Sequence, residues 1–236
     1  MKMLFDDAPV IVAAGMAFEA RIAKGAGVRA VYGQKRQAYI RNLHELVRAG
    51  ARGIISFGVA GGLSPSLKPG DIVVASSVVT AKTSFPTDPR WSQSLRNALK
   101  HAVSGVSVFA ADATVMTVLE KEALWKGTGA AAVDMESGVA AEVADYYEIP
   151  FSVLRLIIDP AHRSIPISAT VGARQNGTTD GLAVIRSLMR RPGDIGEIIR
   201  LADDARKANR SLLRCRQALG PFFSLLDPLD LPLNVE

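Results

Sequence analysis

Short runs in which nearly every residue is apolar recur along the chain at the length of a strand. The clearest is Phe151–Ile158 (FSVLRLII), and Pro9–Ala14 (PVIVAA) and Gly53–Phe57 (GIISF) have the same character. Strands that are apolar on both faces are typical of a sheet that helices cover on both sides. Further strands are predicted at Val28–Tyr32, Asp71–Val79, Val106–Ala111 and Ala130–Val133.

Segments with helical spacing of apolar residues alternate with these runs. Gln34–Ala49 is one, with Leu43, Leu46 and Val47 on one face, and it ends at Gly50, a common helix stop. Residues 16–24 fit either a short helix or a loop. Further helices are predicted at Asp88–Val103, Val118–Lys126, Glu136–Tyr147, Asp180–Arg190 and Pro192–Leu219. The alternation predicts an α/β fold with a central mixed or parallel sheet flanked by helices on both sides.

The chain has 236 residues, enough for one large α/β domain, and it contains no internal repeat or low-complexity linker. We therefore expect a single domain over residues 1–220. Residues 221–236 form an apolar, proline-containing tail without a basic residue. Such a tail more often packs along its own or a partner subunit, and membrane contact is the alternative, although interfacial anchors normally carry Lys or Arg.

The sequence predicts a cytoplasmic protein. The apolar runs are far shorter than the roughly 20 residues that span a bilayer, and residues 1–7 lack the core of a signal peptide. The single Cys215 excludes an intramolecular disulfide, and its apolar stripe predicts burial. The net charge of +5 is concentrated late in the chain, which usually indicates a solvated helix face. Without a nucleic-acid motif, we expect no nucleic-acid partner.

Acidic residues follow most of the predicted strands. Glu19 follows the first, Asp112 the fourth, Asp134 and Glu136 the brief strand before a helix, and Asp159 the last. Ligands of open α/β sheets bind beyond the carboxyl ends of the strands. The pattern therefore predicts a carboxylate-based active site, although helix or turn capping accounts for some of these residues.

A glycine-rich stretch, Gly58–Gly62, follows the strand at Gly53–Phe57, and we expect it to be a loop. It fits a tight turn as well as a phosphate or sugar cradle. It is not the GxGxxG pattern of dinucleotide-binding proteins, which disfavours an oxidoreductase.

Three segments together carry a resemblance to a known family. SFGVAGGL (Ser56–Leu63), AVDMESGVAAEVA (Ala132–Ala144) and VLRLIIDPA (Val153–Ala161) resemble the purine nucleoside phosphorylase/nucleosidase superfamily. The match covers residues 8–215 and is nearest to the 5′-methylthioadenosine/S-adenosylhomocysteine nucleosidase branch. GMAFEARIA (Gly15–Ala23), DGLAVIRSLMRRP (Asp180–Pro192) and the basic last helix are similar to the hopanoid-associated phosphorylase group.

The resemblance implies an activity and partners. The hopanoid-associated group is thought to remove adenine from adenosylhopane, a nucleoside attached to a polycyclic lipid. The implied substrate is thus a small-molecule purine nucleoside, which in that group is linked to a lipid. A lipid-linked substrate implies that the protein contacts the inner membrane peripherally. The superfamily also implies a homo-oligomer. A 5′-methylthioadenosine/S-adenosylhomocysteine nucleosidase and a non-catalytic nucleoside-binding protein are the alternatives.

The resemblance also assigns roles to individual residues. Asp159 looks like the general acid that protonates the purine N7, which the reaction needs because an adenine anion leaves poorly. Glu136 resembles the carboxylate that binds the ribose hydroxyls, and Arg155 matches a strand arginine that we interpret as structural. Glu136 as a first-turn acid and Asp159 as a turn cap are the alternatives. The remaining substrate-binding candidates are Met135 against the sugar, Thr114 and Val115 at the base, and Gly15 and Gly58.

Glu19 decides between water and phosphate as the nucleophile. The nucleosidases have a glutamate there that activates water, whereas hexameric phosphorylases have an arginine that clamps phosphate. Ser56 and Val59 also replace phosphate-binding residues of those phosphorylases. Arg21 and Arg36, with the glycine backbone, are the candidates for a different phosphate site. The residues favour water; no metal or cofactor is expected, and inorganic phosphate stays open as a co-substrate.

Overall fold

The central strand of the sheet is β3 (Gly53–Gly62), which pairs with three other strands. The computed structural model describes residues 8–33, 35–166, 193 and 195–225. β1 (Val10–Ala13) lies parallel to the first half of β3, and β10 (Phe151–Asp159) lies parallel to it on the other side. These strands come from the three clearest apolar runs of the sequence, and their residues are almost all buried.

The remaining strands extend the sheet in both directions and make it mixed. β9 is antiparallel to the glycine-rich end of β3, β4 is antiparallel to β10, and most other pairs are parallel. The predicted fold class, a central mixed sheet, is therefore confirmed. The remaining strands are β2 (Val28–Val31), β4 (Ile72–Val74), β5 (Ser77–Val79), β6 (Ser84–Pro86), β7 (Val103–Ser104), β8 (Ser107–Ala110) and β9 (Ala132–Asp134).

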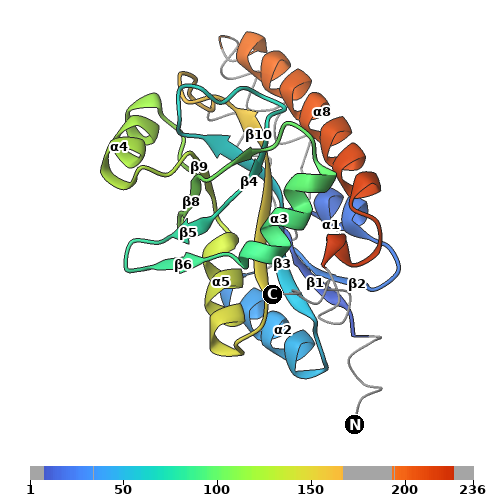
Figure 1. The fold of residues 1–236 in the computed structure, drawn as a ribbon. Coiled ribbons are helices and arrows are strands. Elements are labelled where there is room, and N and C mark those ends of the chain that lie inside the picture. The colour runs from blue at the N-terminus through green and yellow to red at the C-terminus, as the bar shows by residue number, and fades with distance from the viewer. Residues whose placement is uncertain (1–7, 34, 167–192, 194, 226–236) are drawn as a thin grey trace, which may run out of the picture.

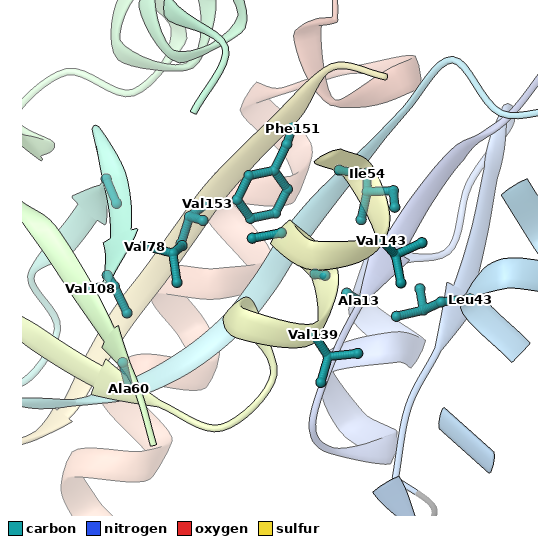
Figure 2. Packing of buried hydrophobic residues seen from close by; sticks show 14 of the residues in the cluster. Ala13, Leu43, Ile54, Ala60, Val78, Val108, Val139, Val143, Phe151 and Val153 are labelled. Carbon is teal, nitrogen blue, oxygen red and sulfur yellow. The ribbon is translucent and has the colours of Figure 1, made fainter. Parts of the chain in front are cut away.

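Helices cover both faces of the sheet (Figure 1). α2 (Arg36–Arg48) and α5 (Ser137–Tyr146) bury their apolar side chains on one face, where Val139 and Val143 of α5 lie among strand residues (Figure 2). The other face is covered by α1, α3 and α8, and Cys215 of α8 is buried in that layer, as its apolar stripe predicts. The remaining helices are α1 (Ala17–Ala23), α3 (Pro89–Ala98), α4 (Val118–Thr128) and α8 (Ile195–Ala218).

The glycine stretch 58–62 is part of a strand, so its assignment to a loop was wrong. Gly58 pairs with Arg155 of β10, and Gly61 pairs with both Asp159 and Val133. Pairing on two sides keeps the backbone extended, and small residues leave room for side chains that approach from neighbouring elements. A Cβ atom at Gly58 would overlap the carboxylate of Glu19. The glycines therefore provide space beside the strand.

Most predicted elements differ from the structure by a few residues at their ends, and two further elements differ by more. The predicted strand Asp71–Val79 is two strands, because β4 pairs with β10 whereas β5 pairs with β8. The predicted helix Asp88–Val103 ends at Ala98, since Leu99 leaves the helical conformation (φ −109°, ψ 81°) and β7 follows. Residues 16–24 contain a helix, α1. The predicted helix Asp180–Arg190 lies outside the described residues. Within the described ranges, no helix has the length and apolarity needed to cross a membrane.

The segment after α8 returns to the core in a short 3-10 helix, η2 (Pro221–Ser224). Phe223 is fully buried there, with its ring centroid 5.0 Å from that of Phe57 in β3. The indole Nε1 of Trp91 in α3 donates a 2.8 Å hydrogen bond to the carbonyl oxygen of Phe223. The first residues beyond 220 thus pack against the sheet layer, and residues 226–236 lie outside the described part.

Replacing Trp91 with Phe is expected to lower the free energy of unfolding by about 2 kcal/mol, because the buried carbonyl of Phe223 loses its donor. Urea denaturation followed by circular dichroism measures the change. The matched control is Trp125→Phe in α4, a partly exposed residue, for which a change within about 0.5 kcal/mol is expected. Equal losses in the two variants would contradict the importance of the Trp91 hydrogen bond.

Candidate active site

A cavity of about 240 Å³ lies beside the glycine-rich half of β3. Four carboxylates line it, and the described lining residues include no lysine or arginine. The structure thus brings the three carboxylates of the predicted site, Glu19, Glu136 and Asp159, into one cavity. The fourth is Asp134, and the other lining residues include Gly15, Met16, Val59, Gly61, Thr114, Val115, Met135 and Ile165.

Strand direction explains this convergence. β1, β3 and β10 are parallel, so Glu19 and Asp159, which come at or after the ends of β1 and β10, lie at the same edge of the sheet. β9 runs in the opposite direction along β3. Its end, Asp134, and the following Glu136 therefore turn back over the middle of β3. The site is built from both directions along the same strand.

Glu19 lies in the first turn of α1 and is buried, with 1% of its surface exposed. Its Oε2 accepts hydrogen bonds from the backbone N–H groups of Gly15 (2.8 Å) and Met16 (2.7 Å). Its Oε1 accepts one from the N–H of Val59 (2.7 Å). Burial raises the pKa of Glu19, and the Arg155 charge and these backbone donors oppose that rise. A carboxylate has about four lone-pair sites, so three donors leave one for a further proton donor.

Arg155, interpreted from the sequence as structural, lies at the centre of the polar network beneath the cavity. It is fully buried, and its Nε is 2.6 Å from Oδ2 of Asp134. Its Nη2 donates a 2.6 Å hydrogen bond to the hydroxyl of Ser56 and lies 3.4 Å from Oε2 of Glu136. The guanidinium therefore links Asp134, at the end of β9, to Glu136, the N-cap residue of α5.

Glu136 is the N-cap residue of α5, so it lies one position before the first turn, where the alternative role of a first-turn acid would place it. Its side chain is 23% exposed at the cavity. A Cβ atom on Gly15 would overlap this carboxylate. The absence of a side chain at Gly15 therefore leaves the space that the carboxylate of Glu136 occupies. Burial raises the pKa of Glu136 to about 7; Arg155 opposes this rise, while the negative charges of Asp134 and Glu19 add to it.

The raised pKa of Glu136 predicts an acidic limb in the pH profile. Below about pH 7 the group is protonated, and above it the carboxylate can accept hydrogen bonds from a ligand hydroxyl. The value of kcat/KM for a nucleoside should therefore rise with pH through about 7, measured between about pH 5 and 9. Glu136→Gln should remove this limb. A limb that persists in the variant would assign the titration to another group.

Asp159 is buried at the end of β10, and its Oδ2 forms an ion pair with Nζ of Lys121 in α4. Burial raises the pKa of Asp159, and the charge and hydrogen bond of Lys121 oppose that rise. Asp159 is therefore a carboxyl group with a raised pKa that borders a cavity, and a raised pKa favours the role of a proton donor.

Thr114, Val115 and Met135 form the outer wall of the cavity. The hydroxyl of Thr114 lies 3.7 Å from the sulfur of Met135, and Met135 is 42% exposed. The same three residues also line a neighbouring cavity of about 520 Å³ between β8, α4 and α5. The two cavities therefore lie next to each other and share this wall.

The two arginines predicted to hold phosphate do not line the carboxylate cavity. Arg21 is exposed on α1. Arg36 lines the neighbouring cavity, where its Nη1 lies 3.1 Å from Oδ1 of Asp112. Over the residues that the structure describes, there is also no group of three His, Cys, Asp or Glu side chains that could hold a metal ion.

Sequence reasoning missed Lys121, and it counted Asp134 among the acidic residues after the strands without giving it a role in the site. Lys121 belongs to a helix with little amphipathic character and with charged neighbours, so a fully buried lysine has no periodic signal there. Capping is the alternative role for such an acid, and Asp134 does accept a hydrogen bond from the N–H of Ser137 (3.0 Å). Its second partner, Arg155, is distant in sequence, so the ion pair could not be predicted.

Comparisons with known proteins agree with this architecture. The model of the phosphorylase superfamily matches residues 5–189. Among solved structures, a 5′-methylthioadenosine/S-adenosylhomocysteine nucleosidase from Helicobacter pylori is 17% identical, with a TM-score of 0.61 over 89% of this chain and 98% of that one. A putative methylthioadenosine nucleosidase from Weissella paramesenteroides is 18% identical, with a TM-score of 0.59 over 93% and 100%. The futalosine hydrolase of Helicobacter pylori is 19% identical, with a TM-score of 0.57 over 64% and 88%.

Proposed function

The chain belongs to the phosphorylase superfamily and is an enzyme of the nucleoside phosphorylase and nucleosidase type; from this premise we propose that it hydrolyses the N-glycosidic bond of an adenine nucleoside. The convergence of Glu19, Glu136 and Asp159 on one cavity carries the proposal. The similar Helicobacter pylori structure is a nucleosidase of 5′-methylthioadenosine and S-adenosylhomocysteine, which supports an adenine nucleoside as substrate.

Asp159 serves as the general acid. Its carboxyl proton passes to N7 of the purine while the bond from the ribose C1′ to N9 breaks, and the bonding electron pair moves into the purine ring. Glu136 accepts hydrogen bonds from the ribose 2′- and 3′-hydroxyls, which strengthen as the sugar gains oxocarbenium character. Met135 packs against the sugar, and Thr114 and Val115 hold the base.

Water is the nucleophile in this proposal. Glu19 accepts a proton from the water while the water oxygen bonds to C1′. The backbone N–H groups of Gly15, Met16 and Val59 hold the carboxylate of Glu19 in place. The described lining residues of the cavity include no lysine or arginine to hold a phosphate dianion. Arg21 and Arg36, the candidates for a phosphate site, lie outside this cavity.

The neighbouring cavity of about 520 Å³ suggests which substituent the nucleoside carries. Its wall includes the apolar side chains of Phe109, Val115, Leu124 and Val139. Five charged residues also line it: Arg36, Lys82, Asp112, Glu120 and Glu142. We therefore propose a nucleoside with a bulky apolar 5′ substituent, and adenosylhopane is the first compound of that kind to test. The second candidate substrate is 5′-methylthioadenosine, favoured by the similar nucleosidases.

Adenine release from a panel of nucleosides tests the proposal. The purified enzyme is incubated with adenosine, 5′-methylthioadenosine and adenosylhopane, each with and without inorganic phosphate. We expect phosphate-independent release of adenine and the free sugar, fastest with adenosylhopane. Release that requires phosphate and yields a sugar 1-phosphate would contradict hydrolysis. Binding of the nucleosides without any adenine release would favour a non-catalytic nucleoside-binding protein.

A lipid-linked substrate also implies contact with a membrane surface. Membership of the superfamily separately favours a homo-oligomer. Liposome flotation can test the contact by comparing the full chain with a chain that ends at Leu225. This end point keeps the buried Phe223 and therefore the core packing. Equal flotation of the two chains would contradict a membrane role for residues 226–236, and light scattering gives the oligomeric state.

A further inference from the structure

Lys121 is a fully buried lysine whose three ammonium protons are all used near the carboxyl end of β10. Its Nζ donates to Oδ2 of Asp159, to the carbonyl oxygen of Pro160 (3.0 Å) and to that of Arg163 (2.8 Å). Its exposed fraction is 0%. A buried charge is costly unless it is paired and hydrogen-bonded, so this arrangement is a specific one.

The two oxygens of Asp159 have different surroundings. Oδ2 is bound by Lys121, whereas among the described residues Oδ1 accepts no hydrogen bond. Both oxygens border Gly61, since a Cβ atom there would lie 3.3 Å from Oδ2 and 3.4 Å from Oδ1. Gly61 and Asp159 both line the carboxylate cavity. Lys121 therefore holds one oxygen and leaves the other available to a ligand.

We propose that Lys121 is a positioning residue for the reaction: it orients Asp159 so that Oδ1 faces the departing base, and its ammonium stabilises the carboxylate that forms there. The inference rests on the proposed role of Asp159 as the general acid. Lys121 itself transfers no proton and does not touch the substrate.

The charge balance of the step explains why a cation is useful at this position. In the proposed step, Asp159 begins as a neutral carboxyl group with its proton on Oδ1, and Lys121 carries one positive charge next to Oδ2. When the proton moves to N7, a negative charge appears on Asp159 in a buried site, where an unpaired charge is costly. The ammonium of Lys121 is already in contact with Oδ2, so no rearrangement is required to stabilise that charge.

The other charged groups around Asp159 are few. Arg163, in the turn after β10, lowers the pKa of Asp159, and Asp204 of α8 raises it. Arg163 and Asp204 pair with each other, with Nη2 and Oδ2 2.7 Å apart. Their opposing effects leave Lys121 as the largest influence that lowers the pKa of Asp159. Removing its charge should therefore raise that pKa.

Lys121→Met, Lys121→Gln and Lys121→Arg test the proposal on two substrates. One is adenosine or the best nucleoside of the panel, and the other is a nitrophenyl β-riboside, whose leaving group departs without protonation. We expect Lys121→Met to lower kcat for the nucleoside by about tenfold or more and to change the nitrophenyl reaction little. The alkaline limb of the nucleoside profile should move up by about one pH unit. Lys121→Arg should restore part of the rate.

Lys121→Gln keeps donors for the carbonyls of Pro160 and Arg163 but lacks the charge, so it separates the charge from the structural contacts if Lys121→Met fails to fold. Lys126→Met, an exposed lysine on the same helix, is the control. An equal fall on both substrates, or an unmoved alkaline limb, would overturn the proposal. Loss of Asp159 without effect on nucleoside cleavage would instead overturn the acid role in the proposed function.

Discussion

Replacing Asp159 with Asn is expected to lower kcat for adenine release by at least about a hundredfold, because the amide cannot donate a carboxyl proton to N7. Adenine is a poor leaving group as an anion, so protonation contributes directly to the barrier. Asn keeps the shape of the side chain and an oxygen that can accept from Lys121. The measurement is steady-state adenine release at the pH optimum of the parent enzyme.

The control for this change is Asp145→Asn at the exposed end of α5, which should leave the rate unchanged. Thermal unfolding of both variants is needed, since Lys121 in the Asp159 variant loses a charged partner in a buried site. A folded Asp159→Asn enzyme with a near-normal rate would remove Asp159 from the chemical step.

Replacing Glu19 with Gln is expected to lower hydrolysis by about a thousandfold, because the base that accepts the proton of water is lost. Both oxygens of Glu19 accept backbone hydrogen bonds, so the Gln amide must also direct its N–H groups toward at least one of these donors. Local displacement of the site therefore adds to the loss. The assay is adenine release with and without phosphate.

Affinity for a non-hydrolysable nucleoside analogue separates the two causes in the Glu19 variant. If loss of the base dominates, the Kd should rise by less than about tenfold while kcat falls far more. Glu45→Gln, an exposed residue of α2, is the matched control. A Glu19→Gln enzyme that still releases adenine when phosphate is supplied would show that phosphate, and not water, attacks the sugar.

The positions of the three catalytic candidates could be predicted because each follows an apolar run that is buried on both faces. Parallel strands bring their carboxyl ends to one edge, which accounts for Glu19 and Asp159 together. Glu136 reaches the same cavity by another route, since β9 is antiparallel to β3. Strand direction within a mixed sheet depends on pairing between segments that are distant in sequence. The sequence therefore predicted that Glu136 belongs to the site, but not that an antiparallel β9 brings it there.

The errors have a common physical origin in partners that are distant in sequence. Gly58–Gly62 has the composition of a turn, yet two neighbouring strands keep it extended. Lys121 is separated by 38 residues from Asp159, and its burial depends entirely on that carboxylate and two carbonyls. Composition suggests an exposed lysine because most lysines are exposed. Only the folded structure shows the three acceptors that allow Lys121 to be buried.

The burial of Phe223 has a consequence for synthesis on the ribosome. Its ring lies against Phe57 of the central strand, and its carbonyl oxygen accepts the hydrogen bond of Trp91, 132 residues earlier. While translation is in progress, β1, β3 and α3 emerge long before residue 223 does. One apolar layer of the nascent chain therefore stays incomplete until η2 is translated.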